Sequence, residues 1–146
     1  MDALDIKAGN FLYFNTRSGG VNYLGTLTCS GTFNFRKSLA QAIVNDSLGE
    51  ITTTTSGTIN IDTSCADAFL NHGIFTNSDL VDVDSSARRE ITNYPTASFV
   101  NYGRLYFTDV FAEGFLNSGV VTNDQILIEW DSKKRRDIRM QNLILK

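Results

Sequence analysis

The nine residues Phe69-Leu70-Asn71-His72-Gly73-Ile74-Phe75-Thr76-Asn77 recur, little changed, as Phe115-Leu116-Asn117-Ser118-Gly119-Val120-Val121-Thr122-Asn123. Each copy joins an apolar-x-Asn-x-Gly block to an apolar-Thr-Asn block. Alignment on the apolar residue of the second block finds further copies and gives five anchors, spaced by 24, 24, 24 and 22 residues: Leu27, Ile51, Phe75, Phe99 and Val121. A period this regular indicates an internal repeat.

The repeat extends on both sides of each anchor. An apolar pair with one residue between follows it, at Phe33/Phe35, Ile59/Ile61, Val81/Val83 and Leu105/Phe107. A series of asparagines precedes it, at Asn22, Asn45, Asn71, Asn93 and Asn117. Residues 9–13 resemble residues 31–35 and Ile138 resembles the start of another turn, so partial copies flank the array. The last repeat cannot be aligned uniquely, because residues 126–130 fit either alternation of inward and outward positions.

Each repeat therefore contains three short strands of alternating polarity, separated by Gly, Asn, Asp or Ser. Strands of this length cannot bury an apolar face alone, whereas stacked copies can. We expect an all-β architecture, a solenoid of about five to six coils of roughly 22–26 residues; its identification as a right-handed parallel β-helix comes from a resemblance described below. An antiparallel sandwich or barrel is the alternative, but the constant period argues against it.

Stacking places equivalent residues of successive coils about 4.8 Å apart. Asn77, Asn101 and Asn123 recur two residues after their anchors. We expect them to point inward and to form a hydrogen-bonded ladder of amides, because buried polar groups need partners.

The length predicts one domain over residues 1–146. We expect a partial coil at 1–20, core coils at 21–130, and a basic turn with a terminal strand at 131–146. The apolar residues 143–145 have no coil to cover them, so the ends are expected to meet the rest of a longer solenoid or another copy of the chain.

The blocks around Asn71-x-Gly73 and Asn117-x-Gly119 resemble the Asn-x-Gly repeats of right-handed parallel β-helices. The period is similar to that of the pectate-lyase-like superfamily, and the resemblance covers residues 9 to 130. It implies three strands per coil and internal asparagine ladders. It also implies a place among large bacterial secreted or surface-attached proteins, within a superfamily of lyases, hydrolases, adhesins and phage tailspikes.

Composition and charge exclude several classes. The chain has 15 Thr and 13 Asn but one Pro, which favours strands and turns. Residues 1–130 have 7 basic and 14 acidic side chains, a charge of −7 that suits nucleic acid poorly. No apolar run is long enough for a transmembrane helix, and the chain shows no signal peptide. Cys29 and Cys65 lack zinc-ligand spacing, so no metal or cofactor is expected.

Catalytic candidates are few. The single histidine, His72, has no nucleophile motif beside it and is expected at the surface. Asp79, Asp82 and Asp84 lie close together, and Arg104 follows one coil later. Two outward carboxylates could act as acid and base or bind Ca²⁺. A solvated strand edge explains them equally, because the equivalent positions in neighbouring coils are Asn60 and Tyr106.

The second strand of each repeat is expected to present a flat face with one charge, Glu50, in ten outward positions. Such a face usually marks a contact surface. Its candidate binding residues are Thr26, Thr28, Thr52, Ile74, Thr76, Val100, Val120 and Thr122. The first strand is expected to turn a second apolar strip outward, at Val44, Leu70, Thr92 and Leu116.

The repeat and the weakly charged face together predict a non-catalytic structural or adhesive β-helix module of a bacterial surface or secreted protein, whose partner is a protein or a glycan. The first alternative is a carbohydrate-active enzyme, a polysaccharide lyase or hydrolase that uses the Asp cluster. A lesser alternative is an ice-binding solenoid, which would need a regular Thr-x-Thr array.

Overall fold

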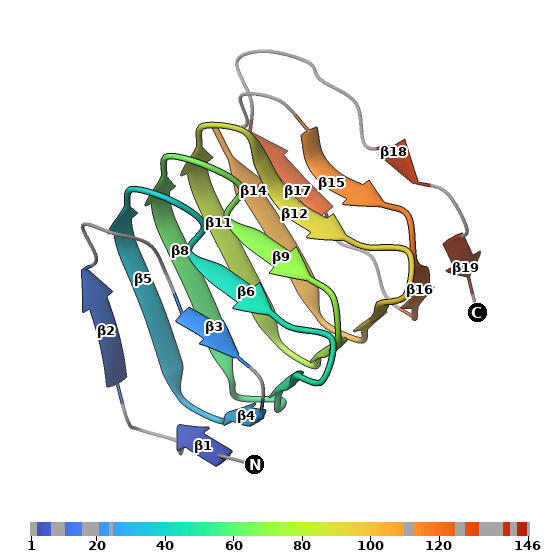
Figure 1. Ribbon diagram of the computed structural model, residues 1–146, viewed down its shortest axis with the longest axis horizontal. Coiled ribbons are helices and arrows are strands. Elements are labelled where there is room, and N and C mark those ends of the chain that lie inside the picture. Colours follow the sequence, from blue (N-terminus) through green and yellow to red (C-terminus); the bar gives the residue numbers. More distant parts are fainter. Residues whose placement is uncertain are drawn as a thin grey trace.

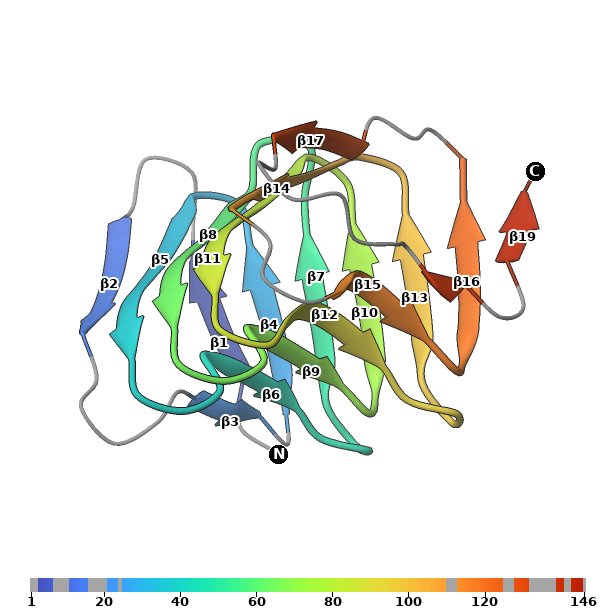
Figure 2. The same cartoon turned by 90° about the horizontal axis from the view of Figure 1, so that it is seen from above.

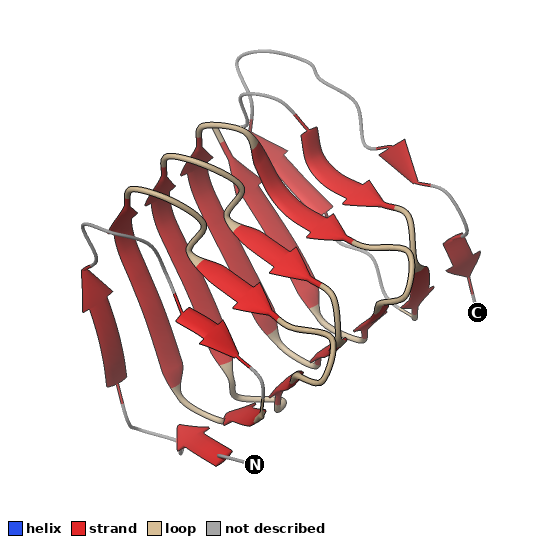
Figure 3. Cartoon of the chain, in the orientation of Figure 1, coloured by secondary structure: helices blue, strands red, loops and turns tan. Residues whose placement is uncertain are grey.

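The computed structural model describes residues 3–6, 11–15, 21–23, 25–109, 113–124, 128–131, 139–140 and 143–145, and it describes side chains within 25–109 and 114–124. These residues form strands and turns without a helix (Figure 3). All the strands pair in parallel within three sheets, which we name A, B and C.

The strands of each sheet come from successive coils, so every third strand of the chain joins the same sheet. Sheet A contains β1 (Ala3–Ile6), β4 (Thr26–Cys29), β7 (Glu50–Thr53), β10 (Ile74–Asn77), β13 (Ser98–Asn101), β16 (Val120–Asn123) and β19 (Leu143–Leu145). Sheet B contains β2 (Phe11–Asn15), β5 (Thr32–Ser38), β8 (Thr58–Ser64), β11 (Leu80–Ser86), β14 (Arg104–Thr108) and β17 (Ile128–Asp131). Sheet C contains β3 (Val21–Tyr23), β6 (Ile43–Asn45), β9 (Phe69–Asn71), β12 (Arg89–Asn93), β15 (Glu113–Asn117) and β18 (Arg139–Met140).

The chain therefore winds as a parallel β-solenoid, as the repeat predicted. In Figure 1 it passes up the far sheet B and down the near sheet C while it advances toward the C-terminus, which makes the coil right-handed. Figure 2, from above, shows the three sheets enclosing one interior. The stretch between residues 25 and 124 makes about four turns, slightly fewer than the five to six expected, and the strands before and after it extend the sheets to seven, six and six strands.

The register confirms the anchors. Phe75 pairs with Ile51 on one side and with Phe99 on the other, and Phe99 pairs with Val121. The alignment of the last repeat is resolved, because Ile128 pairs with Leu105 and Trp130 pairs with Phe107.

Two alignments at the N-terminal end were wrong by one residue. Asn22 pairs with Val44, whereas Tyr23 pairs with Asn45 and takes the ladder position. Leu12, not Phe11, pairs with Phe33. In both places an apolar or aromatic residue stands one position further along the sequence, so the sequence match alone could not choose between the two phases.

Columns of apolar side chains fill the interior. The anchors and the paired positions of sheet B are 5 % exposed or less. The rings of Phe75 and Phe99 are tilted by 42° to each other with centroids 4.8 Å apart, and Phe69 and Phe115 meet these rings edge to face at 4.8 and 5.0 Å. Burial of this surface supplies most of the stability of the fold.

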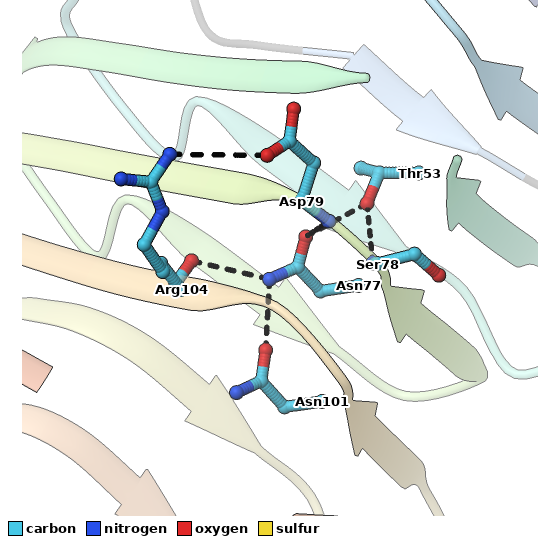
Figure 4. A network of polar contacts seen from close by, with 6 residues as sticks. All are labelled: Thr53, Asn77, Ser78, Asp79, Asn101 and Arg104. Atoms are coloured by element: carbon cyan, nitrogen blue, oxygen red, sulfur yellow. Dashed lines mark hydrogen bonds and ion pairs between the residues drawn. The ribbon is translucent and has the colours of Figure 1, made fainter. Parts of the chain in front are cut away.

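Two asparagine ladders line the corners where sheets A and C end. In the first, each side-chain Nδ2 donates to the Oδ1 of the next coil, from Asn45 to Asn71 (2.7 Å), Asn93 (2.8 Å) and Asn117 (2.7 Å). In the second, Asn77 donates to Asn101 at 2.8 Å (Figure 4), and Asn101 donates to Asn123 at 2.9 Å. The predicted inward orientation of this second series is confirmed, since its members are 0 to 7 % exposed.

The strands of sheet B bend at one repeated position. Lys37, Thr63, Ser85 and Asp109 all have a positive φ, of 54°, 58°, 58° and 49°. The residues on either side of Lys37, Thr63 and Ser85 pair in register, so these bends stack from coil to coil. None of the four is glycine, the residue that adopts this conformation without strain. The bend turns the chain from sheet B toward sheet C in every coil.

Candidate functional site

The outer face of sheet A is built as the sequence predicted. The backbone register aligns Thr28, Thr52, Thr76, Val100 and Thr122 in one column, and Thr26, Glu50, Ile74, Ser98 and Val120 in the other. All ten side chains are exposed or half-buried. Ile74 and Val120 are among the most exposed large apolar residues, at 49 % and 48 %.

Only one coil of this face carries threonine at both outward positions, at Thr26 and Thr28. Glu50, Ile74, Ser98 and Val120 replace threonine in the neighbouring coils. The face is therefore a mixed surface of hydroxyl and methyl groups with one carboxylate, and it lacks the regular array that ice binding requires.

The second apolar strip expected on sheet C lies in one column of the register, on the side opposite the buried core residues. Val44 and Leu116 are half-buried, whereas Leu70 and Thr92 are only 7 % and 5 % exposed. The prediction was wrong for Leu70 and Thr92, because strand alternation alone does not show what packs over the outside of a sheet.

The four catalytic candidates divide into two places. Arg104 lies directly beside Leu80 in the register, at the start of its strand, and its guanidinium reaches the carboxylate of Asp79 at 3.9 Å (Figure 4). The Arg104 side chain is 62 % exposed, so this ion pair is worth little. Asp82 and Asp84 lie farther along β11, on the outer face of sheet B.

Asp82 and Asp84 line a groove that crosses β5, β8 and β11. The groove has a volume of about 270 Å³, and its other polar lining residues are Asn34, Arg36, Asn60 and Asp62. Burial, and then the charge of Asp84, raise the pKa of Asp82 above its ordinary value. Arg104 is not among the lining residues, so the four candidates do not meet in one site.

Sequence reasoning placed Asn60 in the outward column of Asp82 but missed Asn34. Both stand in that column, and Asn60 Nδ2 donates to Asn34 Oδ1 at 2.8 Å. Extending the alignment of outward positions by one more coil would have found Asn34. Beside it, Arg36 pairs with Asp62 at 3.5 Å.

The remaining candidates are structural. The ring of His72 stacks on Tyr94 with centroids 3.8 Å apart, on the turns between sheets C and A. Cys29 and Cys65 are both free thiols. Cys29 is buried, its Sγ lies 3.3 Å from the carbonyl oxygen of Gly31, and burial raises the pKa of its thiol. Among the described residues, no three His, Cys, Asp or Glu side chains converge as a metal site would require.

Glu90 is a buried carboxyl that sequence reasoning missed. Its position corresponds to Ala68 in the preceding coil, since Ile91 pairs with Phe69, and both residues are fully buried. Neither carboxyl oxygen has a hydrogen-bond partner of good geometry. Burial raises the pKa of Glu90 to about 8, although Ser86 close by lowers it and the charge of Asp84 adds to the rise.

The described part of the chain contains no helix that is long and apolar enough to cross a membrane. Comparison with models of known families, with curated proteins and with solved structures found no match to this chain.

Proposed function

We propose that this protein is a non-catalytic β-solenoid module that binds a protein partner through the outer face of sheet A. The observation that carries the proposal is the composition of that face. Two registered columns present methyl and hydroxyl groups over five coils, with Glu50 as the one charged side chain. Contact surfaces between proteins are depleted of charge in this way, whereas solvated strands are not.

A protein suits this face better than a glycan does. None of the ten outward residues is aromatic, so the face has no ring on which a sugar could stack. The exposed side chains of Ile74 and Val120 instead offer apolar surface that a partner would bury. The resemblance of the repeats to those of bacterial surface and secreted proteins extends the proposal to an extracellular or cell-surface location and an adhesive role.

Photocrosslinking tests this proposal. A photoreactive amino acid at Val100 should give one discrete adduct with an extracellular protein of the native environment. The affinity of the purified pair should then fall at least tenfold in the double variant Ile74→Lys, Val120→Lys, because two lysines would be buried against the partner. Thr108→Lys, on sheet B, is the matched control and should bind normally. Absence of an adduct, or unchanged affinity in the double variant, contradicts the proposal.

A carbohydrate-active enzyme is the second candidate, favoured by the raised pKa of Asp82 in the groove of sheet B. It would use Asp82 and Asp84 as acid and base. A polysaccharide depolymerisation screen with and without Ca²⁺ distinguishes the two. Robust activity that is lost in Asp82→Asn would replace the non-catalytic proposal.

A further inference from the structure

Exposed apolar side chains gather at the corner where the chain turns from sheet C into sheet A. Of the five exposed large hydrophobic residues in the described part of the chain, three lie there: Leu48 at 74 %, Ile74 at 49 % and Val120 at 48 %. Pro95 is exposed in the coil between Ile74 and Val120. These four residues come one from each of four successive coils, and we name them the corner ridge.

Backbone hydrogen bonds hold the coils in step along this corner. The N–H of Ile74 donates to the carbonyl oxygen of Gly49, and the N–H of Val120 donates to that of Ala97, both at 3.0 Å. In Figure 2 the turns that lead from β9 into β10 and from β12 into β13 follow one another along this edge. The residues of the corner ridge therefore advance by about 4.8 Å per coil, the spacing of neighbouring strands.

Leucine is an unusual residue for the turn that carries Leu48. This residue is the third of the turn 46–49, which is closed by a hydrogen bond of 2.8 Å from the last N–H to the first carbonyl oxygen. The turn 54–57 is closed in the same way at 2.9 Å, and its third residue is Ser56. Turns favour small polar residues and glycine at such positions. A leucine on the tip of a turn offers apolar surface to a partner rather than to the fold.

The charge of the corner has one sign. Four segments build it, residues 43–53, 69–77, 91–101 and 115–123. They contain two carboxylates, Asp46 and Glu50, and no lysine or arginine. Both carboxylates lie two residues from Leu48, at one end of the corner ridge. A partner that is apolar along the ridge and basic at this end complements the corner.

An α-helix matches the spacing of the corner ridge better than an extended strand does. Side chains on one face of a helix recur with each turn, about every 5.4 Å. On one face of a strand they recur with every second residue, about every 6.7 Å. Against a coil spacing of about 4.8 Å, a helix falls out of step by about 0.6 Å per coil and a strand by about 2 Å. A helix can therefore meet all four coils, whereas a strand is out of step after two.

We propose that the corner ridge binds an amphipathic helix of the protein partner. The helix lies along the axis of the solenoid and packs one apolar side chain against each coil, with a basic residue beside Asp46 and Glu50. The inference rests on the function proposed above, because it names the element of the partner that meets this edge of sheet A.

The spacing of photocrosslinks tests the inference. The whole chain, with a photoreactive amino acid at Leu48, Ile74 or Val120, is mixed with the purified partner that Val100 captures, and the modified residues of the partner are mapped by mass spectrometry. The adducts from Leu48 and Val120 should lie about ten residues apart in the partner, because three coils span roughly 14 Å and a helix rises 1.5 Å per residue. An extended segment would instead place them about four residues apart.

A substitution at Leu48 tests the contact itself. Leu48→Ser gives the turn the residue that the turn 54–57 has, and it should weaken partner binding about tenfold. Its denaturation curve should match that of the wild type, because an exposed side chain contributes little to the fold. Leu39→Ser is the matched control, since Leu39 is 59 % exposed between β5 and β6, and it should bind normally.

Salt dependence tests the basic end of the helix. Affinity should fall as the salt concentration rises, and it should fall less in the double variant Asp46→Asn, Glu50→Gln. Full binding by Leu48→Ser, adducts about four residues apart, or an unchanged salt dependence in the double variant overturns the inference while the proposed function stands. Absence of an adduct from Val100 contradicts both.

Discussion

At the scale of single residues, an asparagine within a ladder is a hydrogen-bond partner for the coil before it and for the coil after it. Asn101 accepts from Asn77 at 2.8 Å and donates to Asn123 at 2.9 Å and to the carbonyl oxygen of Gly103 at 2.9 Å. One substitution therefore deprives several buried groups of partners.

Asn101→Leu should lower the free energy of unfolding by about 1–3 kcal/mol, because the amides of Asn77 and Asn123 each lose a partner in the interior. Chemical denaturation measures the change. Thr76→Leu is the control, since Thr76 lies on the outer face of sheet A and is half-buried, and it should cost much less. Equal costs for the two variants would contradict a stabilising role for the inner ladder.

Glu90 predicts a pH dependence of stability. Its pKa is about 8 in the folded chain, against an ordinary value of 4.5. Between these values the unfolded chain releases the proton and the folded chain keeps it, so the contribution of Glu90 to stability is fully present below pH 4.5 and is lost as the pH rises toward 8. Glu90→Gln is neutral throughout and should be less sensitive to pH over this range.

Urea denaturation from pH 4.5 to 9 measures this difference between the wild-type chain and Glu90→Gln. The control Glu50→Gln removes an exposed carboxylate from sheet A and should follow the wild-type curve. A Glu90→Gln curve parallel to that of the wild type would show that Glu90 is ionised in the folded chain.

At the scale of the elements, the strands of sheet B hold strained residues at their common bend. Thr63 is the least suited of them, because its branched Cβ crowds the backbone at φ 58°. Asparagine tolerates this conformation better. Thr63→Asn should therefore stabilise the chain by about 0.5–1 kcal/mol in a denaturation experiment.

Thr58→Asn is the matched control for Thr63→Asn. Thr58 lies on the same strand, β8, outside the bend, where threonine is the better residue. It should be neutral or slightly destabilising. Stabilisation by both variants would point to a general effect of asparagine rather than to relief of the bend.

The elements also mark how far the sequence could predict this fold. One repeated block of sequence predicts the strands, the repeat period and the order of strands in each sheet. It also predicts the inner ladder of Asn77, Asn101 and Asn123. The bend did not, because Lys37, Thr63, Ser85 and Asp109 share no residue type that signals a positive φ. The sequence revealed only part of the groove. Asp82 is recognisable in the sequence as a charged residue, whereas Asn34 stands out only because the structure shows that it is buried.

At the scale of the whole molecule, each sheet has two outer strands that pair on one side only within the described residues. These are β1 and β19 in sheet A, β2 and β17 in sheet B, and β3 and β18 in sheet C. Open strand edges of this kind pair readily with other strands. The basic turn expected at 133–136 lies outside the described residues.

We expect the isolated chain to associate through these edges. Sedimentation velocity over rising concentration should show a shift from monomer to larger species, because backbone hydrogen bonds at the edges gain partners. A strictly monomeric protein at high concentration would instead mean that the edges are protected.

The asparagine ladders have one more consequence. In every rung between Asn45 and Asn117 the amide nearer the N-terminus donates and the one nearer the C-terminus accepts. Asn45 Oδ1, at the first rung, is buried without a partner, because Tyr23 holds the preceding position. The solenoid thus has a polarity independent of its backbone. The register places Tyr23 before Asn45, so only a side chain that donates a hydrogen bond at position 23 could extend this ladder toward the N-terminus. Each amide of the ladder thus turns its donor toward the coil that follows and its acceptor toward the coil that precedes.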